Sequence, residues 1–179
     1  CWIWVQRWEK YFENDKKTVN LLQTGVKMAE ITVNIKKIVD NFLKIEELCK
    51  KMEKKLMVIT KCIRADKKIV SELIKNGVSS IGDKAIWNLI KIEDKAEKML
   101  MKIPYTFSGE NEFEIYYVSD LKIVDRLSKI SGDRKVKIMI PLETGELREG
   151  VAAEEIVNFV KEGLKYKNIE IYGITINFG

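Results

Sequence analysis

Short apolar runs alternate with amphipathic helical patterns along most of the chain. The apolar runs begin near residues 56, 78, 99, 114, 136 and 169, and most are continuous rather than alternating, which is typical of parallel strands covered on both faces. Between them, apolar residues recur at helical spacing. The repeated order of strand and helix predicts an α/β protein built on a parallel sheet.

Several residues mark where the predicted elements begin and end. Asn34 precedes a helical pattern and can cap it. A second helix is expected from about Asp66, and Gly77 follows it at the position that favours glycine. Asp83 is expected to cap the next helix. Ahead of the first helix, Glu30–Val33 alternates like a short strand.

Two architectures fit six units of strand and helix: an open doubly wound sheet, or part of a closed (β/α)₈ TIM-type barrel. A closed barrel takes about 250 residues, and residues 28–179 are fewer. A barrel here is therefore expected to be truncated after about six parallel strands, with open edges that natural proteins avoid. In that case the chain would be a fragment.

The first 27 residues do not share this pattern. They are rich in tryptophan and lack an initiating methionine. They are either an N-terminal extension or a genuine N-terminal helix. The sequence is accordingly divided into an extension of uncertain structure, 1–27, and a partial barrel domain, 28–179.

Composition and charge exclude several classes of protein. The chain of 179 residues is 46% hydrophobic and 33% charged, which is typical of a soluble globular protein. The net charge of +5 is scattered among glutamates, without the basic stripe of a nucleic-acid-binding surface. No apolar run reaches the length of a membrane helix, and no signal-peptide pattern is present. We expect a cytoplasmic protein without a nucleic-acid or membrane partner.

The absence of histidine limits the possible chemistry. Without it, histidine-based zinc sites and Ser-His or Cys-His nucleophile pairs are excluded. The cysteines at positions 1, 49 and 62 have neither disulfide-like nor metal-like spacing, so no metal site is expected. A base or nucleophile must therefore be lysine, cysteine, tyrosine, aspartate or glutamate.

Lys61 stands directly after the apolar run Leu56–Thr60. That position is the carboxyl end of a strand, where parallel α/β folds place their chemistry. A lysine amine in a partly dehydrated place can form Schiff bases, whereas a lysine that merely ends a strand points to water. The adjacent Cys62 is expected to point to the other side of the extended backbone as a small buried residue.

Four segments at strand ends together carry a resemblance to a known family. The segments are Thr60-Lys61-Cys62, Ile81-Gly82-Asp83 with Asn88 in the following helix, Glu143–Gly150 and Gly173–Phe178. Their order and spacing are similar to those of the alanine racemase-like, fold-type III enzymes that use pyridoxal 5′-phosphate (PLP), most of all the branch of ornithine racemase and related amino-acid racemases. The similarity covers roughly Met28–Gly179 and implies the barrel fold.

The resemblance implies roles for three residues in a PLP-dependent amino-acid racemase (an isomerase) acting on ornithine or a similar basic amino acid. Lys61 would form the Schiff base with PLP and remove or return the substrate's α-proton. Arg148 would lie near the cofactor's phenolic oxygen, unless it is an exposed loop arginine paired with Glu146 or Glu149. Asn177 would lie against the cofactor ring, unless its amide only satisfies backbone groups. The full-length protein would be a homodimer.

Two departures from the family pattern qualify this expectation. Pro141 is expected to interrupt the end of its strand, because proline cannot donate to the sheet. The family's phosphate-binding loops and second base belong to later strands, so we expect this chain alone to be inactive or nearly so. A non-enzymatic PLP-binding protein of the PLP homeostasis family and a cofactor-free α/β binding domain remain as alternatives, and Asn88 is expected to be structural.

Overall fold

The fold was obtained as a computed structural model. The structure describes residues 2–5, 32–93, 95–104, 106–109, 112–145, 147 and 149–177. Among these residues, no helix is both long and apolar enough to cross a membrane.

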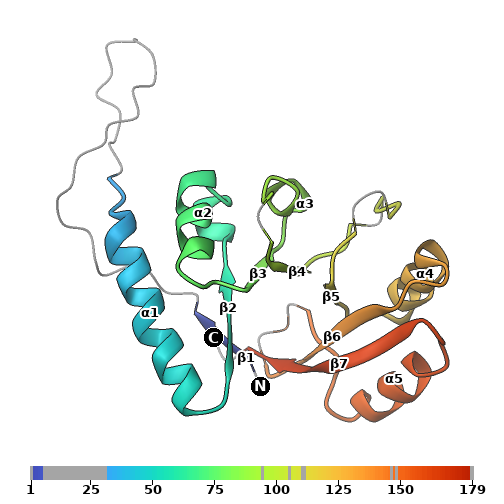
Figure 1. Ribbon diagram of the computed structural model, residues 1–179. Helices are drawn as coiled ribbons and strands as arrows, with labels where there is room; N and C mark the ends of the chain where they lie inside the picture. Colours follow the sequence, from blue (N-terminus) through green and yellow to red (C-terminus); the bar gives the residue numbers. More distant parts are fainter. Residues whose placement is uncertain are drawn as a thin grey trace, which may run out of the picture.

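In the described part of the chain, seven parallel strands form one sheet, in which each strand pairs with the next one along the chain (Figure 1). Their bounds are Trp2–Val5 (β1), Lys55–Ile59 (β2), Ser80–Asp83 (β3), Glu97–Leu100 (β4), Ile115–Tyr117 (β5), Val136–Leu142 (β6) and Ile169–Ile176 (β7). The six strands expected from the apolar runs correspond to β2–β7. The backbone of β1 lies in parallel register beside residues 55–58 of β2. Because residues 6–31 lie outside the described part, the division of the chain at residue 27 stays a prediction.

Five α-helices and one short 3₁₀ turn connect the described strands. Their bounds are Ile35–Lys51 (α1), Lys61–Ile63 (the 3₁₀ turn η1), Lys67–Lys75 (α2), Ile86–Leu89 (α3), Leu121–Ser131 (α4) and Ile156–Gly163 (α5). Figure 1 shows the α-helices along the outer side of a curved row of strands.

The order of the strands distinguishes the two predicted architectures. A doubly wound sheet reverses its strand order at a switch point, whereas a barrel sheet follows the chain in sequence. Here the order runs from β1 to β7 without reversal. The predicted truncated (β/α)₈ barrel is therefore confirmed, and the sheet forms a half-barrel.

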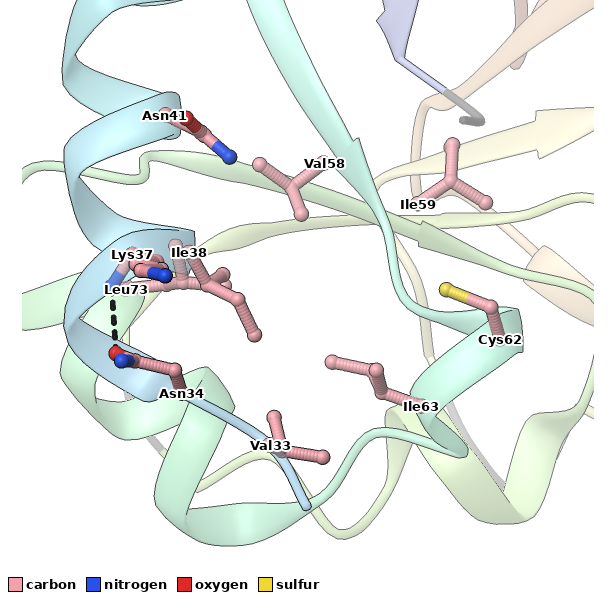
Figure 2. Close-up of a pocket in the computed structure, with 10 residues that line it drawn as sticks. All are labelled: Val33, Asn34, Lys37, Ile38, Asn41, Val58, Ile59, Cys62, Ile63 and Leu73. Carbon is pink, nitrogen blue, oxygen red and sulfur yellow. Dashed lines mark hydrogen bonds between the residues drawn. The ribbon is translucent and has the colours of Figure 1, made fainter. Parts of the chain in front are cut away.

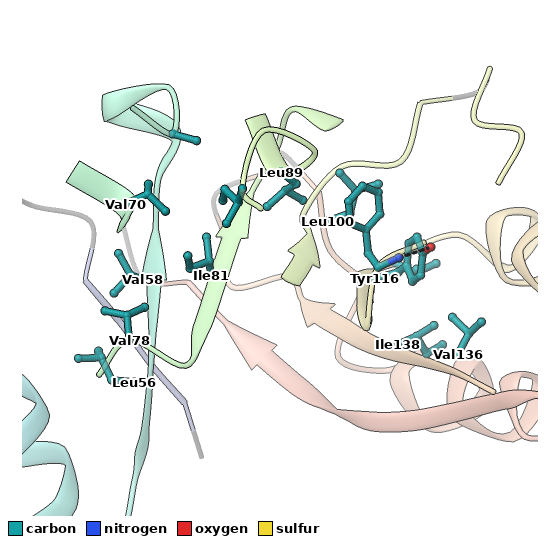
Figure 3. Packing of buried hydrophobic residues seen from close by; sticks show 14 of the residues in the cluster. Leu56, Val58, Val70, Val78, Ile81, Leu89, Leu100, Tyr116, Val136 and Ile138 are labelled. Atoms are coloured by element: carbon teal, nitrogen blue, oxygen red, sulfur yellow. Dashed lines mark hydrogen bonds between the residues drawn. The ribbon is translucent and has the colours of Figure 1, made fainter. Parts of the chain in front are cut away.

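The two faces of the sheet carry separate apolar clusters. The larger cluster joins strand residues such as Val58, Ile81 and Ile138 to residues of the surrounding helices (Figure 3). The smaller one contains only residues on or beside the strands and lies on the face turned away from the helices. We call it the inner cluster, and it consists of Met57, Ile59, Met99, Met101, Ile115 and Met139. Apolar residues on both faces explain why the strands read as continuous apolar runs.

Side chains cap the beginnings of α1 and α2, and the cap at Asn34 was predicted. The side chain of Asn34 accepts the N–H of Lys37 at 2.9 Å, and this bond caps α1. Asp66 accepts the N–H groups of Lys68 and Ile69, both at 3.1 Å, and caps α2. Gly77 follows α2 with φ +105, a conformation that residues with a side chain rarely adopt.

The strand predicted at Glu30–Val33 is not found in the two of its residues that the structure describes. Thr32 and Val33, the described part of the expected strand Glu30–Val33, carry no strand. The position beside β2 that such a strand would take is occupied by the backbone of β1. Alternation over four residues is a weak signal, since it specifies neither partner nor position.

Candidate functional site

Lys61 lies at the carboxyl edge of the sheet, two residues after β2 ends. The chain leaves the strand through the 3₁₀ turn η1, which begins at Lys61 itself. The side chain is partly buried, and no hydrogen bond or ion pair joins its ammonium to another residue in the described part of the chain. A primary amine so placed has no internal partner to compete with an incoming carbonyl group.

A buried polar network adjoins Lys61. The hydroxyl of Thr60 donates to Oδ2 of Asp83 at 2.7 Å, and Nδ2 of Asn88 donates to both carboxylate oxygens at 3.2 Å. The exposed fractions of Thr60, Asp83 and Asn88 are 0%, 1% and 4%. The expectation that Asn88 is structural agrees with these contacts.

Asp83 does not cap a helix, contrary to the expectation. It is the last residue of β3, and the N-terminal cap of α3 is Ala85. Its carboxylate instead accepts the N–H of Ala85 at 2.9 Å and the hydroxyl of Thr60. A capping pattern in the sequence shows only that a carboxylate lies near backbone N–H groups that lack a partner within the helix. In this structure the hydrogen bond to Thr60 also helps to fix where the Asp83 carboxylate lies.

The long loop between β6 and α5 forms the next part of this edge. Oε1 of Glu143 accepts the N–H groups of Gly145 and Leu147, at 2.6 and 3.0 Å. The loop closes where Val151 forms a parallel bridge with Leu142. A Cβ at Gly150 would lie 2.7 Å from the backbone nitrogen of Glu143. Close backbone contact therefore requires glycine at the end of the loop.

Pro141 does not interrupt β6, and that expectation is wrong. The strand continues to Leu142, with Pro141 in register with Thr175 of β7. Its carbonyl accepts the N–H of Val151 at 2.8 Å. The pairing of β6 with β5 ends at Met139. At Pro141, β6 therefore pairs in register with β7 alone, and the backbone N–H that proline lacks is tolerated there.

The structure brings Asn177 and the β6–α5 loop together. The hydroxyl of Thr144 donates to the backbone carbonyl of Asn177 at 2.6 Å, directly after β7. Arg148 belongs to the same loop, but the residue itself lies outside the described part of the chain. Its predicted role, and that of Asn177, stay predictions.

Described contacts also link the Lys61 turn to this loop. Lys84, which follows Asp83, forms an ion pair with Glu149 at 3.2 Å. Thr60 is hydrogen-bonded to Asp83, Lys84 is the next residue along the chain, and the side chain of Lys84 pairs with Glu149 of the loop. Among the described residues, no hydrogen bond joins Lys61 to Asn177. Lys61 follows β2 and Asn177 follows β7, so both lie at the carboxyl edge of the sheet.

Cys62 is exposed rather than buried, which corrects the sequence prediction. The alternation of side chains holds only in extended backbone, and the chain has already entered the turn at this point. Its side chain lies at an apolar pocket of about 660 Å³, including space open to solvent, between α1 and the end of β2 (Figure 2). Ile38, Val58 and Ile63 also line this pocket.

Comparison with known proteins gives one family. Residues 33–179 match the family model described as alanine racemase, N-terminal domain. Ornithine racemase from Acetoanaerobium sticklandii is 34% identical over 155 residues, and lysine racemase from Thermotoga maritima is 27% identical over 157 residues. Each alignment covers 83% of this chain and 44% of the relative, so the chain spans less than half the length of the curated relatives it matches.

Solved structures show the same fold. Alanine racemase from Corynebacterium glutamicum gives a TM-score of 0.66 at 16% identity, covering 81% of this chain and 44% of that one. PipY from Synechococcus elongatus PCC7942, in a structure without PLP, gives a TM-score of 0.57 at 15% identity, covering 68% and 62%. At these identities the likeness concerns the fold.

Proposed function

Because the chain belongs to the alanine racemase N-terminal domain family, we propose that it is the Lys61-bearing barrel portion of a PLP-dependent amino-acid racemase. The observation that carries this proposal is the position of Lys61, a partly buried amine without an ion-pair partner among the described residues, at the carboxyl edge of the sheet. The two curated relatives are named for ornithine and lysine. We therefore propose a basic amino acid as the substrate.

The chemistry of the residues at this edge fits PLP. The primary amine of Lys61 can bond covalently to an aldehyde carbon, and a guanidinium from Arg148 would donate to the anionic ring oxygen. The amide of Asn177 would lie against the ring. When bound, the cofactor supplies an electron sink for the negative charge that develops at the substrate's α-carbon.

Proton transfer is assigned to the lysine amine. Nζ of Lys61 would be the base beside the substrate's α-carbon. It would take the proton from the α-carbon on one face or return it there. Racemisation also needs a proton donor on the opposite face. No described residue is assigned this role, so we expect little or no turnover by this chain alone.

Borohydride reduction in the presence of PLP tests the proposal. The purified chain is incubated with PLP, reduced, digested and mapped by mass spectrometry. The label is expected on Lys61 and absent from the variant Lys61→Arg, which keeps the positive charge. Lys67→Arg is the matched control, because Lys67 is an exposed lysine paired with Glu93. A wild-type chain without label on Lys61 would contradict PLP binding and favour a cofactor-free α/β binding domain.

A second candidate is a non-enzymatic PLP-binding protein. The fold similarity to PipY, of which this chain covers 62%, is the observation behind it. Both candidates predict a label on Lys61, so turnover has to separate them. The full-length protein is expected to interconvert L- and D-ornithine or L- and D-lysine. PLP binding without racemisation of either pair would favour the second candidate. Substantial racemisation by the 179-residue chain would refute the expected inactivity.

A further inference from the structure

The backbone around Lys61 adopts a tight turn that its own sequence does not favour. The carbonyl of Thr60 accepts two N–H groups, those of Ile63 at 3.1 Å and Ala65 at 3.3 Å. Arg64 and Ala65 have φ values of 51 and 49. The left-handed conformation is unfavourable for residues with a Cβ. Such a turn persists when the surrounding structure fixes it.

Thr60 is the residue through which the surroundings fix the turn. Its N–H donates to the carbonyl of Gly82 at 3.0 Å, and its hydroxyl donates to Oδ2 of Asp83 at 2.7 Å. Both partners lie on β3, the strand beside β2 (Figure 1). The residue directly before Lys61 is therefore held to the neighbouring strand by its backbone and by its side chain.

Asp83 is in turn held by α3. Its Oδ1 accepts the N–H of Ala85, and Nδ2 of Asn88 reaches both carboxylate oxygens. Oδ1 of Asn88 is buried and has no hydrogen-bond partner among the described residues. Because a carboxylate can only accept, the NH₂ group must face Asp83. The amide of Asn88 is thus oriented to donate to Asp83, although its own oxygen has no hydrogen-bond partner among the described residues.

We infer that Thr60, Asp83 and Asn88 form a positioning unit that sets the direction of the Lys61 side chain. The inference deepens the proposed function and rests on it. Among the described residues, no hydrogen bond joins the unit to the Lys61 amine, so the unit acts through the turn. Since the unit is buried, water cannot readily replace a lost hydrogen bond. Misplacement of a reacting group by about 1 Å can cost about 100-fold in rate, so a looser turn would slow covalent capture of PLP.

The variant Thr60→Val tests the inference, because it keeps the shape of the side chain and removes the hydroxyl. Thr60→Ser restores the hydroxyl. Ser128→Ala is the matched control, since it removes a 2.6 Å side-chain bond to Asn168 just before β7, at the other end of the strands. Amide hydrogen exchange at Ile63 and Ala65 reports the turn without any cofactor. The initial rate of reducible PLP labelling reports Lys61.

In Thr60→Val, exchange at both amides should rise about tenfold, and Lys61 labelling should slow by about tenfold or more. Thr60→Ser should lie within about twofold of wild type in both measurements, and Ser128→Ala should change neither. If Thr60→Val does not fold, Asn88→Ala removes the other side chain that donates to Asp83 and should move both readouts in the same direction.

The outcomes separate this inference from the proposed function. Unchanged amide exchange in Thr60→Val, or faster exchange with labelling at the wild-type rate, would overturn the positioning role. If wild-type Lys61 takes no label from PLP, the proposed function fails. Reductive methylation of Lys61 by formaldehyde then provides the second readout. A change in its rate in Thr60→Val would uphold the positioning of the amine, and an unchanged rate would overturn it.

Discussion

Replacing Gly150 with alanine would force apart the two ends of the β6–α5 loop. The added Cβ would lie 2.7 Å from the backbone nitrogen of Glu143 and 2.8 Å from its Cα. Ordinary contact begins at 3.4 Å, so the backbone has to move by about 0.7 Å (3.4 minus 2.7). Two backbone hydrogen bonds close the loop here, from Glu143 to Val151 at 2.9 Å and from Val151 to Pro141 at 2.8 Å.

The expected cost follows from these two bonds. Each contributes about 1 kcal/mol net, so their loss lowers the free energy of unfolding by about 2 kcal/mol. Alanine restricts the unfolded chain and offsets about 0.5 kcal/mol of this loss. A remaining cost of about 1.5 kcal/mol lowers the Tm of a chain of this size by roughly 3–6 °C. Because Arg148 belongs to this loop, PLP labelling of Lys61 should fall as well.

Gly77→Ala is the matched control for this prediction. Gly77 has φ +105 and nothing within 4 Å of a built Cβ, so alanine there is strained by about 1–2 kcal/mol but displaces no neighbour. It lies before β3, away from the carboxyl edge. Urea and thermal unfolding should show both variants destabilised, and only Gly150→Ala should lose labelling. A Gly150→Ala protein as stable as wild type, or equal loss of labelling in both variants, would refute the reasoning.

Two further predictions concern side chains. Iodoacetamide should label Cys62 in the folded chain and Cys49 only after unfolding. Burial, and to a lesser extent the charge of Glu46, raise the pKa of the Cys49 thiol above 9.0. The stability that the buried thiol contributes should therefore be lost as the pH rises beyond about 9. Labelling of Cys49 in the folded chain at pH 8 would contradict this prediction. Glu149→Gln should lower the free energy of unfolding by less than about 1 kcal/mol, because its ion pair with Lys84 is partly exposed. This effect should vanish in 1 M salt, and a larger cost that persists there would count against it.

The elements that local chemistry determines were predictable from the sequence. Asp66 and Gly77 mark the two ends of α2, because capping depends on residues within a few positions of each other. The continuous apolar runs located β2–β7. The strand order, which distinguishes the barrel from a doubly wound sheet, depends on pairing between distant segments. No local pattern reveals that order, and only the family resemblance favoured the correct architecture.

The position of Lys61 after a strand was predictable from the sequence, whereas the hydrogen bonds that surround it were not. Lys61 was selected because it follows a buried strand. The Thr60–Asp83 bond joins residues 23 positions apart, and their burial as a pair cannot be read from either segment. Cys62 was misplaced because strand alternation was extended past the point where the strand ends. Two signals in the sequence could have indicated this bond: a threonine directly before the lysine and an aspartate at the end of the next strand. Polar residues at buried strand ends need hydrogen-bond partners.

The sulfur atoms on the inner face of the sheet imply a graded sensitivity to peroxide. Sulfoxide formation makes methionine polar and disrupts apolar packing. Four methionines of the inner cluster are at most 5% exposed, whereas Met52, at the end of α1, is 51% exposed. Mild oxidant should therefore modify Met52 without harm to the fold. Oxidation of Met57, Met99, Met101 or Met139 requires the sheet to open first, so their sulfoxides would record unfolding rather than cause it.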